Sequence, residues 1–204
     1  MNTFLINPDT EIGIDEAGRG PLIGRVYAGA VIWGDMITGN CSFITDSKKL
    51  TPKKRAIALE WITHNVKAWG VGWAEPTEID TINILEATKL AMDRAIIDLK
   101  QKYNFDDDIT LLIDGTGWEK KFTNYKTKSI IKGDSKFLAI AAASIIAKEY
   151  HDKYITDLCA ENTDLNTKYD LLNNMGYGTK KHIEGIRTHG YSNYHRKSFK
   201  CKNL

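Results

Sequence analysis

The 204-residue sequence predicts an α/β protein with a mixed central β-sheet flanked by helices. One observation is the order of the segments: short apolar runs come first and then alternate with longer stretches of helical periodicity. Another is composition, because 42% hydrophobic and 26% charged residues are typical of a globular chain with a buried core. The length suits one domain, residues 1–204, in which residues 160–204 form a helical and basic C-terminal segment.

Strands are predicted where apolar or β-branched runs end at turn-forming residues. The first two runs, 11–15 and 26–33, are separated by residues 17–24, whose three glycines and Pro21 predict a loop. Further runs at 68–74, 109–113 and 129–131 complete the sheet. The run 109–113 ends directly before Asp114, and the run 129–131 is followed by Lys132, Gly133 and Asp134.

Helices are predicted from capping residues and from apolar spacing. Thr51 as N-cap with Pro52 at the first helical position begins one helix. Residues 77–80 resemble a capping box that opens a long helix. Its expected apolar stripe is Ile82, Leu85, Met92, Ile96 and Leu99. A third helix, 135–160, begins with small residues that allow close approach to a sheet, and a fourth lies near 180–188.

The charge is uneven although the net charge is only +2. Residues 180–204 hold seven Lys or Arg against Glu184, and residues 119–136 hold six Lys against Glu119 and Asp134. Such patches can bind a phosphate backbone, and they are equally typical of an ordinary solvated surface.

Three scattered cysteines, without a CxxC pair, indicate a reducing compartment. The N-terminus lacks the pattern of a signal peptide, and no apolar run is long enough to span a membrane. We therefore expect a cytoplasmic protein with no membrane partner.

Four carboxylates stand where predicted strands end: Asp15, Glu16, Asp114 and Asp134. Side chains at neighbouring strand ends can converge, and converging carboxylates repel one another unless a cation neutralises them. Oxygen ligands without His or Cys favour Mg²⁺ or Mn²⁺. Each position also has a structural explanation: Asp134 as a helix N-cap, Asp114 as a turn residue, and Asp15-Glu16 as an ordinary strand end.

One sequence segment resembles a known family signature: residues 13–22 read GIDEAGRGPL, similar to the ribonuclease HII family. The resemblance continues through DSKKL at 46–50, the long helix at 79–92, Asp114-Gly115, and KGD at 132–134. It then includes AAASIIAK at 141–148, GYGT at 176–179 with His182, and HRKSF at 195–199. It spans roughly residues 12 to 199.

The resemblance implies a ribonuclease H-like fold with a C-terminal helical segment. It implies that Asp15, Glu16, Asp114 and Asp134 are catalytic carboxylates that bind Mg²⁺ or Mn²⁺, with two ions per site when substrate is bound.

Substrate-binding residues also follow from the resemblance. The backbone of Gly18, Arg19 and Gly20 would sense a ribose 2′-OH, and glycines permit that close approach. Tyr177 would pack against the deoxyribonucleotide at an RNA–DNA junction. Further contacts are expected from Lys48 and Lys49 to phosphates, and from Ser144, although packing alone explains the small-residue helix that carries Ser144.

The implied activity is an endonuclease that hydrolyses the RNA strand of RNA–DNA hybrids. It would also cut 5′ of ribonucleotides embedded in duplex DNA, leaving 5′-phosphate and 3′-hydroxyl ends. No Gln-x-x-Leu-x-x-aromatic motif for a sliding clamp is seen at 200–204, and no heptad pattern suggests assembly, so we expect a monomer without a clamp partner.

The sequence departs from the family pattern at Arg25, where Pro is usual, at His151, where Arg is usual, and across 169–175. These departures bear on efficiency and junction preference. Ribonuclease HIII shares the carboxylates, but it typically has Gly-Lys-Gly and an extra N-terminal domain, whereas Arg19 is present here. The carboxylates would also suit a different two-metal nuclease, such as a junction resolvase, and the basic patches would suit a nucleic-acid-binding protein without activity.

Overall fold

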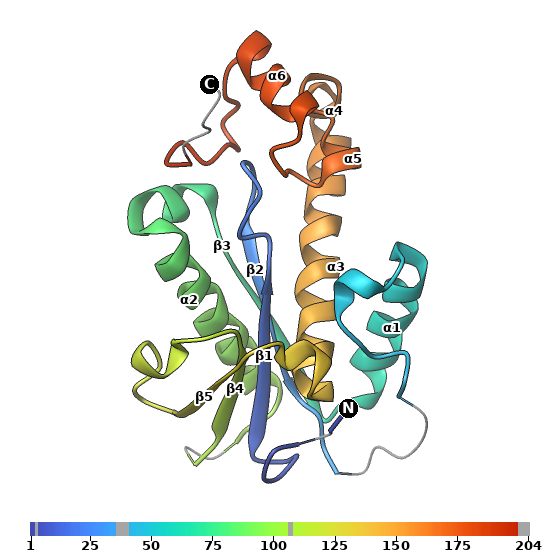
Figure 1. The fold of residues 1–204 in the computed structure, drawn as a ribbon, viewed down its shortest axis with the longest axis vertical. Helices are drawn as coiled ribbons and strands as arrows, with labels where there is room; N and C mark the ends of the chain where they lie inside the picture. The colour runs from blue at the N-terminus through green and yellow to red at the C-terminus, as the bar shows by residue number, and fades with distance from the viewer. Residues whose placement is uncertain (3, 36–40, 106–107, 200–204) are drawn as a thin grey trace.

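The computed structural model describes residues 1–2, 4–35, 41–105 and 108–199. Its centre is a five-stranded sheet in the order β3-β2-β1-β4-β5 (Figure 1). The strands are β1 (Glu11–Ala17), β2 (Val26–Ile32), β3 (Ala68–Ala74), β4 (Thr110–Asp114) and β5 (Lys126–Ile130). β1, β2 and β3 pair antiparallel, while β4 and β5 run parallel to β1, so the predicted mixed sheet is confirmed.

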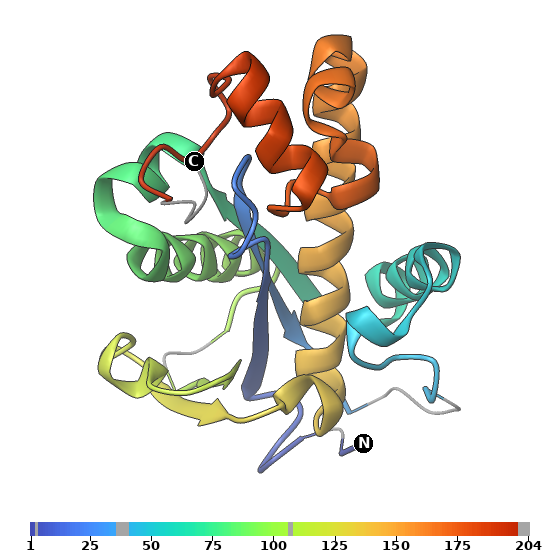
Figure 2. The same cartoon turned by 45° about the horizontal axis from the view of Figure 1, so that its top comes forward.

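Helices cover both faces of this sheet. They are α1 (Pro52–Asn65), α2 (Pro76–Lys102), α3 (Leu138–Glu161), α4 (Thr163–Tyr169), α5 (Leu171–Asn174) and α6 (Lys180–His189). α2 lies on one face, and α3 with α1 lies on the other (Figure 1). The C-terminal helices α4, α5 and α6 gather at the far end of α3, next to the loop between β1 and β2 (Figure 2).

Small residues let α3 lie almost on the sheet. A Cβ atom added to Gly13 would stand 2.4 Å from the carbonyl carbon of Ala139, and one added to Gly29 would stand 2.4 Å from the Ala143 oxygen. Only glycine fits at such a distance. Because strand side chains alternate, Asp15 shares its face with Gly13 and therefore points toward α3.

The start of α2 differs from the prediction. The capping box consists of Glu75 and Glu78 around Pro76, and the Glu75 amide donates to Glu78 Oε2 at 2.9 Å. Asp80, which we expected in the box, instead accepts bonds from the backbone amides of Lys197 at 3.0 Å and Ser198 at 2.8 Å. Asp80 therefore anchors the C-terminal segment to α2 and is not part of the capping box.

The predicted apolar stripe of α2 is broken by a kink. Asn83 has a φ of 68°, and its side chain accepts from the amides of Leu85 and Glu86, which restarts the helix. The residues after Asn83 are rotated relative to those before it, so Leu85 is 40% exposed. Met92, Ile96 and Leu99 are buried as expected.

Several boundaries differ from the predicted ones. β1 continues two residues beyond the predicted end, β5 covers 126–130 instead of 129–131, and α3 begins at Leu138 instead of 135. Residues Gly133–Ser135 form a short 3₁₀ turn before α3. Within the described residues, no helix combines the length and the apolar character needed to cross a bilayer.

Candidate active site

The four predicted carboxylates come from three segments that end at one edge of the sheet. Asp15 and Glu16 lie near the end of β1, and Asp114 ends the neighbouring parallel strand β4. Asp134 lies in the 3₁₀ turn that follows β5. Parallel strands bring their carboxyl ends to the same edge, which is why residues a hundred positions apart meet here.

These carboxylates line one cleft of about 380 Å³ together with most of the other predicted residues. Its lining includes the predicted Gly18, Arg19, Gly20, Lys48, Ser144 and Tyr177, and also Ala17, Ser47 and Lys148. Lys49 is exposed but does not line the cleft. A larger groove of about 750 Å³ lies between β3 and α2 and contains none of the predicted residues.

Asp114 fixes the turn that carries Asp134. Its Oδ1 accepts a hydrogen bond of 2.7 Å from the backbone amide of Gly133. The N-cap of α3 is Phe137, so Asp134 is not the cap of that helix, and one structural explanation for this residue is wrong. Asp134 is left half-buried at the cleft.

Asp15 is the most enclosed of the four. Its side chain is hydrogen-bonded to Ser144 of α3, and its Oδ1 accepts from the Glu16 amide at 2.7 Å. Burial, then the negative charges of Glu16 and Asp114, raise the pKa of Asp15 well above its ordinary value. Ser144 Oγ is also 3.0 Å from Ser47 Oγ, which connects the 46–50 segment to this carboxylate.

Glu16 reaches the cleft although it follows Asp15 directly. β1 remains a strand through Ala17, so alternation places Glu16 on the opposite face from Asp15. The pairing of β1 with β4 ends at Ile14 and Ile113, which leaves this flank of β1 open beyond that point. The Glu16 side chain can therefore turn around the open flank toward Asp114, and its Oε1 accepts from Arg19 at 3.1 Å.

The electrostatics of the cleft are unfavourable without a cation. Burial raises the pKa of Glu16 despite the nearby Arg19 guanidinium. Burial, followed by the charges of Asp114 and Asp46, raises the pKa of Asp134. Carboxylate oxygens suit a hard divalent ion. Among the described residues, no group of three or more Asp, Glu, His or Cys side chains is already arranged to hold a metal ion.

Arg55 supports one wall of the cleft and was not predicted from the sequence. It is buried, and its guanidinium donates to the carbonyl oxygens of Ser47 at 3.3 Å and Leu50 at 3.2 Å. It also pairs with Glu149 at 2.5 Å and Asp152 at 3.1 Å. The 3₁₀ turn Ser47–Lys49 is thereby fixed to α3, which places Lys48 at the cleft.

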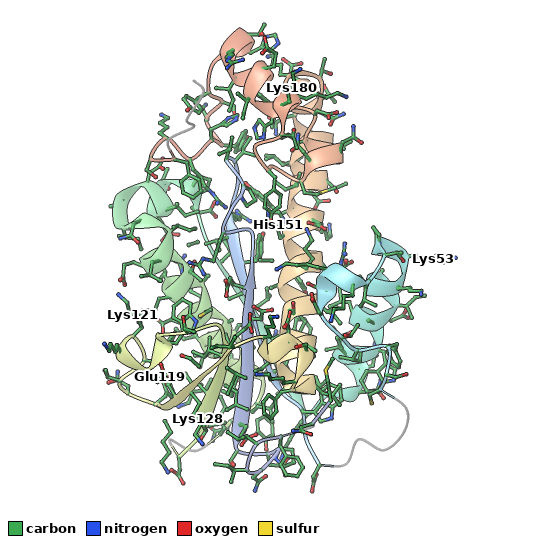
Figure 3. All side chains as sticks on the ribbon, in the orientation of Figure 1. Lys53, Glu119, Lys121, Lys128, His151 and Lys180 are labelled. Carbon is green, nitrogen blue, oxygen red and sulfur yellow. The ribbon has the colours of Figure 1, made fainter. Side chains whose placement is uncertain are left out.

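The loop between β1 and β2, residues 18–25 and called the glycine loop below, packs against His151 and Tyr177. Gly18 has a φ of +85°, and a Cβ there would stand 2.4 Å from the ring of His151. A Cβ on Gly20 would stand 3.1 Å from the ring of Tyr177, so the loop and this tyrosine are neighbours. Figure 3 marks His151 on α3, beside the loop that follows β1.

The departures from the family pattern have defined surroundings. Arg25 pairs with Glu75 at 2.8 Å and lies over the rings of Trp73 and Tyr154, at 5.1 Å and 4.6 Å from their centroids. His151 is fully buried, and its Nδ1 is 3.0 Å from an oxygen of Asp152. Within 169–175, the Tyr169 hydroxyl donates to the Gly190 carbonyl at 2.9 Å.

Comparison with solved structures defines the fold class. RNase HII from Archaeoglobus fulgidus, solved in a complex with PCNA, aligns with a TM-score of 0.70 at 24% identity, covering 96% of this chain and 97% of that one. Bst-RNase HIII, solved in complex with Mn²⁺, aligns with a TM-score of 0.67 at 20% identity, covering 91% and 64%. The fold is therefore that of the ribonucleases HII and HIII.

Sequence comparison defines the family. The family model described as Ribonuclease HII matches residues 12–202. A curated Ribonuclease HII from Rickettsia rickettsii is 49% identical over 191 residues, which cover 93% of this chain and 90% of the relative. The chain belongs to the ribonuclease HII family and is an enzyme of the ribonuclease H class.

Proposed function

We propose that this ribonuclease hydrolyses the RNA strand of RNA–DNA hybrids and cuts duplex DNA on the 5′ side of embedded ribonucleotides. The observation that carries the proposal is a single cleft that combines four carboxylates, the Gly18–Gly20 backbone and Tyr177. The carboxylates supply the chemistry, and the other two features supply a way to distinguish ribose from deoxyribose.

The four carboxylates, Asp15, Glu16, Asp114 and Asp134, would hold Mg²⁺ or Mn²⁺, two ions per site with substrate bound. When bound, these ions supply an activated water and stabilise the leaving 3′-oxygen, which gives 5′-phosphate and 3′-hydroxyl ends. Manganese in a solved RNase HIII of the same fold supports the choice of ion. The raised pKa values of Asp15, Glu16 and Asp134 support a cation as well, because it would relieve the repulsion.

The protein itself positions and recognises the substrate. Lys48 lines the cleft, where its ammonium group would meet a phosphate. Lys148 also lines the cleft, but its ammonium group is paired with Asp152 at 2.7 Å. Tyr177 is 42% exposed beside Gly20, so its ring is available to pack on the sugar that follows a ribonucleotide. Ser144 holds Asp15, and the glycine loop would approach the 2′-OH.

The test is a gel assay on a labelled DNA duplex with one internal ribonucleotide, performed with Mg²⁺, with Mn²⁺ and with a chelator. We expect a metal-dependent cut just 5′ of the ribonucleotide, with a product that a ligase can join. Cleavage of a long RNA–DNA hybrid without that cut would contradict junction recognition. Cleavage of an all-DNA four-way junction would favour a resolvase, and the absence of divalent binding would favour a binding protein without activity.

Partners and compartment stay predictions. The segment 200–204, in which we looked for a clamp-binding motif, lies outside the described residues. The Archaeoglobus fulgidus relative was solved with PCNA. For this chain we keep the expectation of a cytoplasmic monomer without a clamp partner.

A further inference from the structure

Arg196 is a buried cation whose guanidinium donates to carbonyl groups of the glycine loop, residues 18–25. Its side chain is completely buried, and it belongs to the segment that follows α6. An arginine side chain has five N–H donors, and each of the five hydrogen bonds from the Arg196 guanidinium goes to a loop carbonyl. The five acceptors are Gly24 O at 2.8 Å, Arg19 O at 3.0 Å, Pro21 O at 2.8 Å, Gly18 O at 2.6 Å and Arg25 O at 2.9 Å.

The backbone of the same segment holds the rest of the loop. The Arg196 amide donates to Leu22 O at 2.8 Å, and the Gly24 amide donates to Tyr194 O at 2.9 Å. Arg196 itself is supported from behind, because its guanidinium lies 5.1 Å from the centroid of the Phe199 ring. The bonds from Lys197 and Ser198 to Asp80 then fix this segment to α2.

This arrangement determines which backbone groups face the cleft. The peptide bonds of the loop are trans, and a trans peptide holds its N–H opposite its C=O. Because the carbonyls of Gly18 and Arg19 point at Arg196, the N–H groups of Arg19 and Gly20 point away from it. Both residues line the cleft, so N–H groups that point away from Arg196 can donate toward it.

We propose that Arg196 is a positioning residue for ribose recognition: it draws the loop carbonyls inward and so presents the amides of Arg19 and Gly20 to the 2′-OH. The inference rests on the proposed function, because it requires that the loop senses ribose. Lysine cannot replace this arginine, since an ammonium has three donors at a single point and cannot reach five separate carbonyls.

Binding in the absence of cleavage tests the role. Dissociation constants are measured by fluorescence anisotropy for a duplex with one ribonucleotide and for the same duplex as all DNA. Both are measured in an Asp134→Asn background with Mg²⁺. With Arg196 intact we expect tighter binding of the ribonucleotide duplex by about tenfold, the value of one good hydrogen bond. Arg196→Lys is expected to reduce this ratio toward one while the affinity for the all-DNA duplex is kept.

A stability-matched control separates positioning from general damage. Leu99→Ala removes core volume at the end of α2, far from the loop, and should lower the melting temperature. It should leave the ratio of the two dissociation constants unchanged. An unchanged ratio in Arg196→Lys would overturn the role of Arg196, whereas equal binding of both duplexes with Arg196 intact would instead overturn the proposed function of the loop.

A second measurement needs no substitution at Arg196, and so it holds even if Arg196→Lys fails to fold. In the ¹⁵N-labelled Asp134→Asn chain, the Arg196 Nε–H signal should exchange slowly with solvent, because that group is buried on Gly24 O. The amide signals of Arg19 and Gly20 should exchange fast in the free chain and shift on adding the ribonucleotide duplex, but not the all-DNA duplex. Slow exchange of those two amides in the free chain would contradict the outward orientation.

Discussion

The Nε2 atoms of His182 and His195 lie 3.1 Å apart inside the C-terminal segment, and the hydrogen bonds around them define which nitrogen carries the proton. The Ser192 amide donates to His195 Nδ1 at 2.9 Å, so that nitrogen is an acceptor. The Tyr177 carbonyl accepts from His182 Nδ1 at 3.0 Å, so that nitrogen is a donor. Both rings are then neutral, and His195 Nε2–H donates to His182 Nε2.

This pair predicts a loss of stability in mild acid. Burial, then the neighbouring His182, lowers the pKa of His195 to about 4, and burial also lowers the pKa of His182. In the unfolded chain these histidines take up protons near pH 6.5, whereas in the folded chain His195 does so only near pH 4. The stability of the fold is therefore complete above pH 6.5 with respect to these groups, and part of it is lost as pH falls toward 4. We expect the lowered pKa of His195 alone to reduce the free energy of unfolding by about 2 kcal/mol when pH falls from 7 to 5.

Urea unfolding at pH 7 and pH 5 measures this contribution. The variant His195→Asn should be less stable at pH 7 and should show a smaller difference between the two pH values. His64→Asn, at an exposed position of α1, is the matched control and should keep the wild-type difference. If His195→Asn kept the full difference, another group would have to be responsible.

A conservative change at Asp134 should stop cleavage without harming the fold. Asp134→Asn keeps the shape of the side chain and removes one negative charge from the cleft. Substitution of a residue that only orients a metal ligand reduces activity by up to about a hundredfold, and we expect a larger loss when the proposed ligand itself is changed. Because burial and Asp114 raise the pKa of Asp134, removing its charge should leave the melting temperature equal or higher. Single-turnover cleavage and thermal unfolding measure both effects.

Asp93→Asn provides the comparison for Asp134→Asn. Asp93 is paired with Lys89 on the surface of α2, outside the residues that line the cleft, and its substitution should leave cleavage rates unchanged. Full activity of Asp134→Asn under the same metal conditions would remove Asp134 from the site.

Lys48 and Lys49 are adjacent in sequence but differ in place. Lys48 lines the cleft and Lys49 does not, although both are exposed. Lys48→Ala should weaken binding to the hybrid and reduce the salt dependence of affinity by about one counterion, whereas Lys49→Ala should change both values less. Affinities measured at several salt concentrations give both quantities, and equal effects of the two substitutions would show that the cleft does not distinguish these lysines.

The strands of the sheet and the four carboxylates at their ends could be predicted because each leaves a local pattern in the sequence, whereas the other predicted residues that line the cleft followed from the family resemblance. Asp15, Asp114 and Asp134 each follow an apolar run, and the GRG segment is distinctive in its spacing. The turn in which Asp134 lies, by contrast, depends on a bond from Gly133 to Asp114, and no local pattern records a contact across the sheet. The alternative explanation of Asp134 as a helix N-cap was wrong, because α3 begins later and its N-cap is Phe137.

Buried charges were the second kind of feature that the sequence could not reveal. Arg55 and Arg196 resemble surface residues in sequence, since arginine is seldom buried without partners. Arg196 binds carbonyl groups of a loop about 175 positions away. Arg55 binds the nearby carbonyls of Ser47 and Leu50, and it also pairs with carboxylates of α3 that lie more than ninety positions away. Asp80 was misassigned in the same way, because its bonds to Lys197 and Ser198 join residues more than a hundred positions apart.

The exposed ring of Tyr177 leads to a prediction about substrate preference. The Tyr177 ring lies beside Gly20, and His182 holds the Tyr177 backbone carbonyl, so the residue is anchored next to the loop proposed to sense ribose. Tyr177→Ala should reduce kcat/KM on a duplex with one ribonucleotide by about ten- to a hundredfold, the range for loss of one stacking contact. A long RNA–DNA hybrid offers many other contacts and no obligatory junction, so its cleavage should fall less. Tyr177→Phe keeps the ring and should behave as wild type on both substrates. Equal losses on the two substrates in Tyr177→Ala would contradict the junction role and would leave Tyr177 as a residue that only supports the loop.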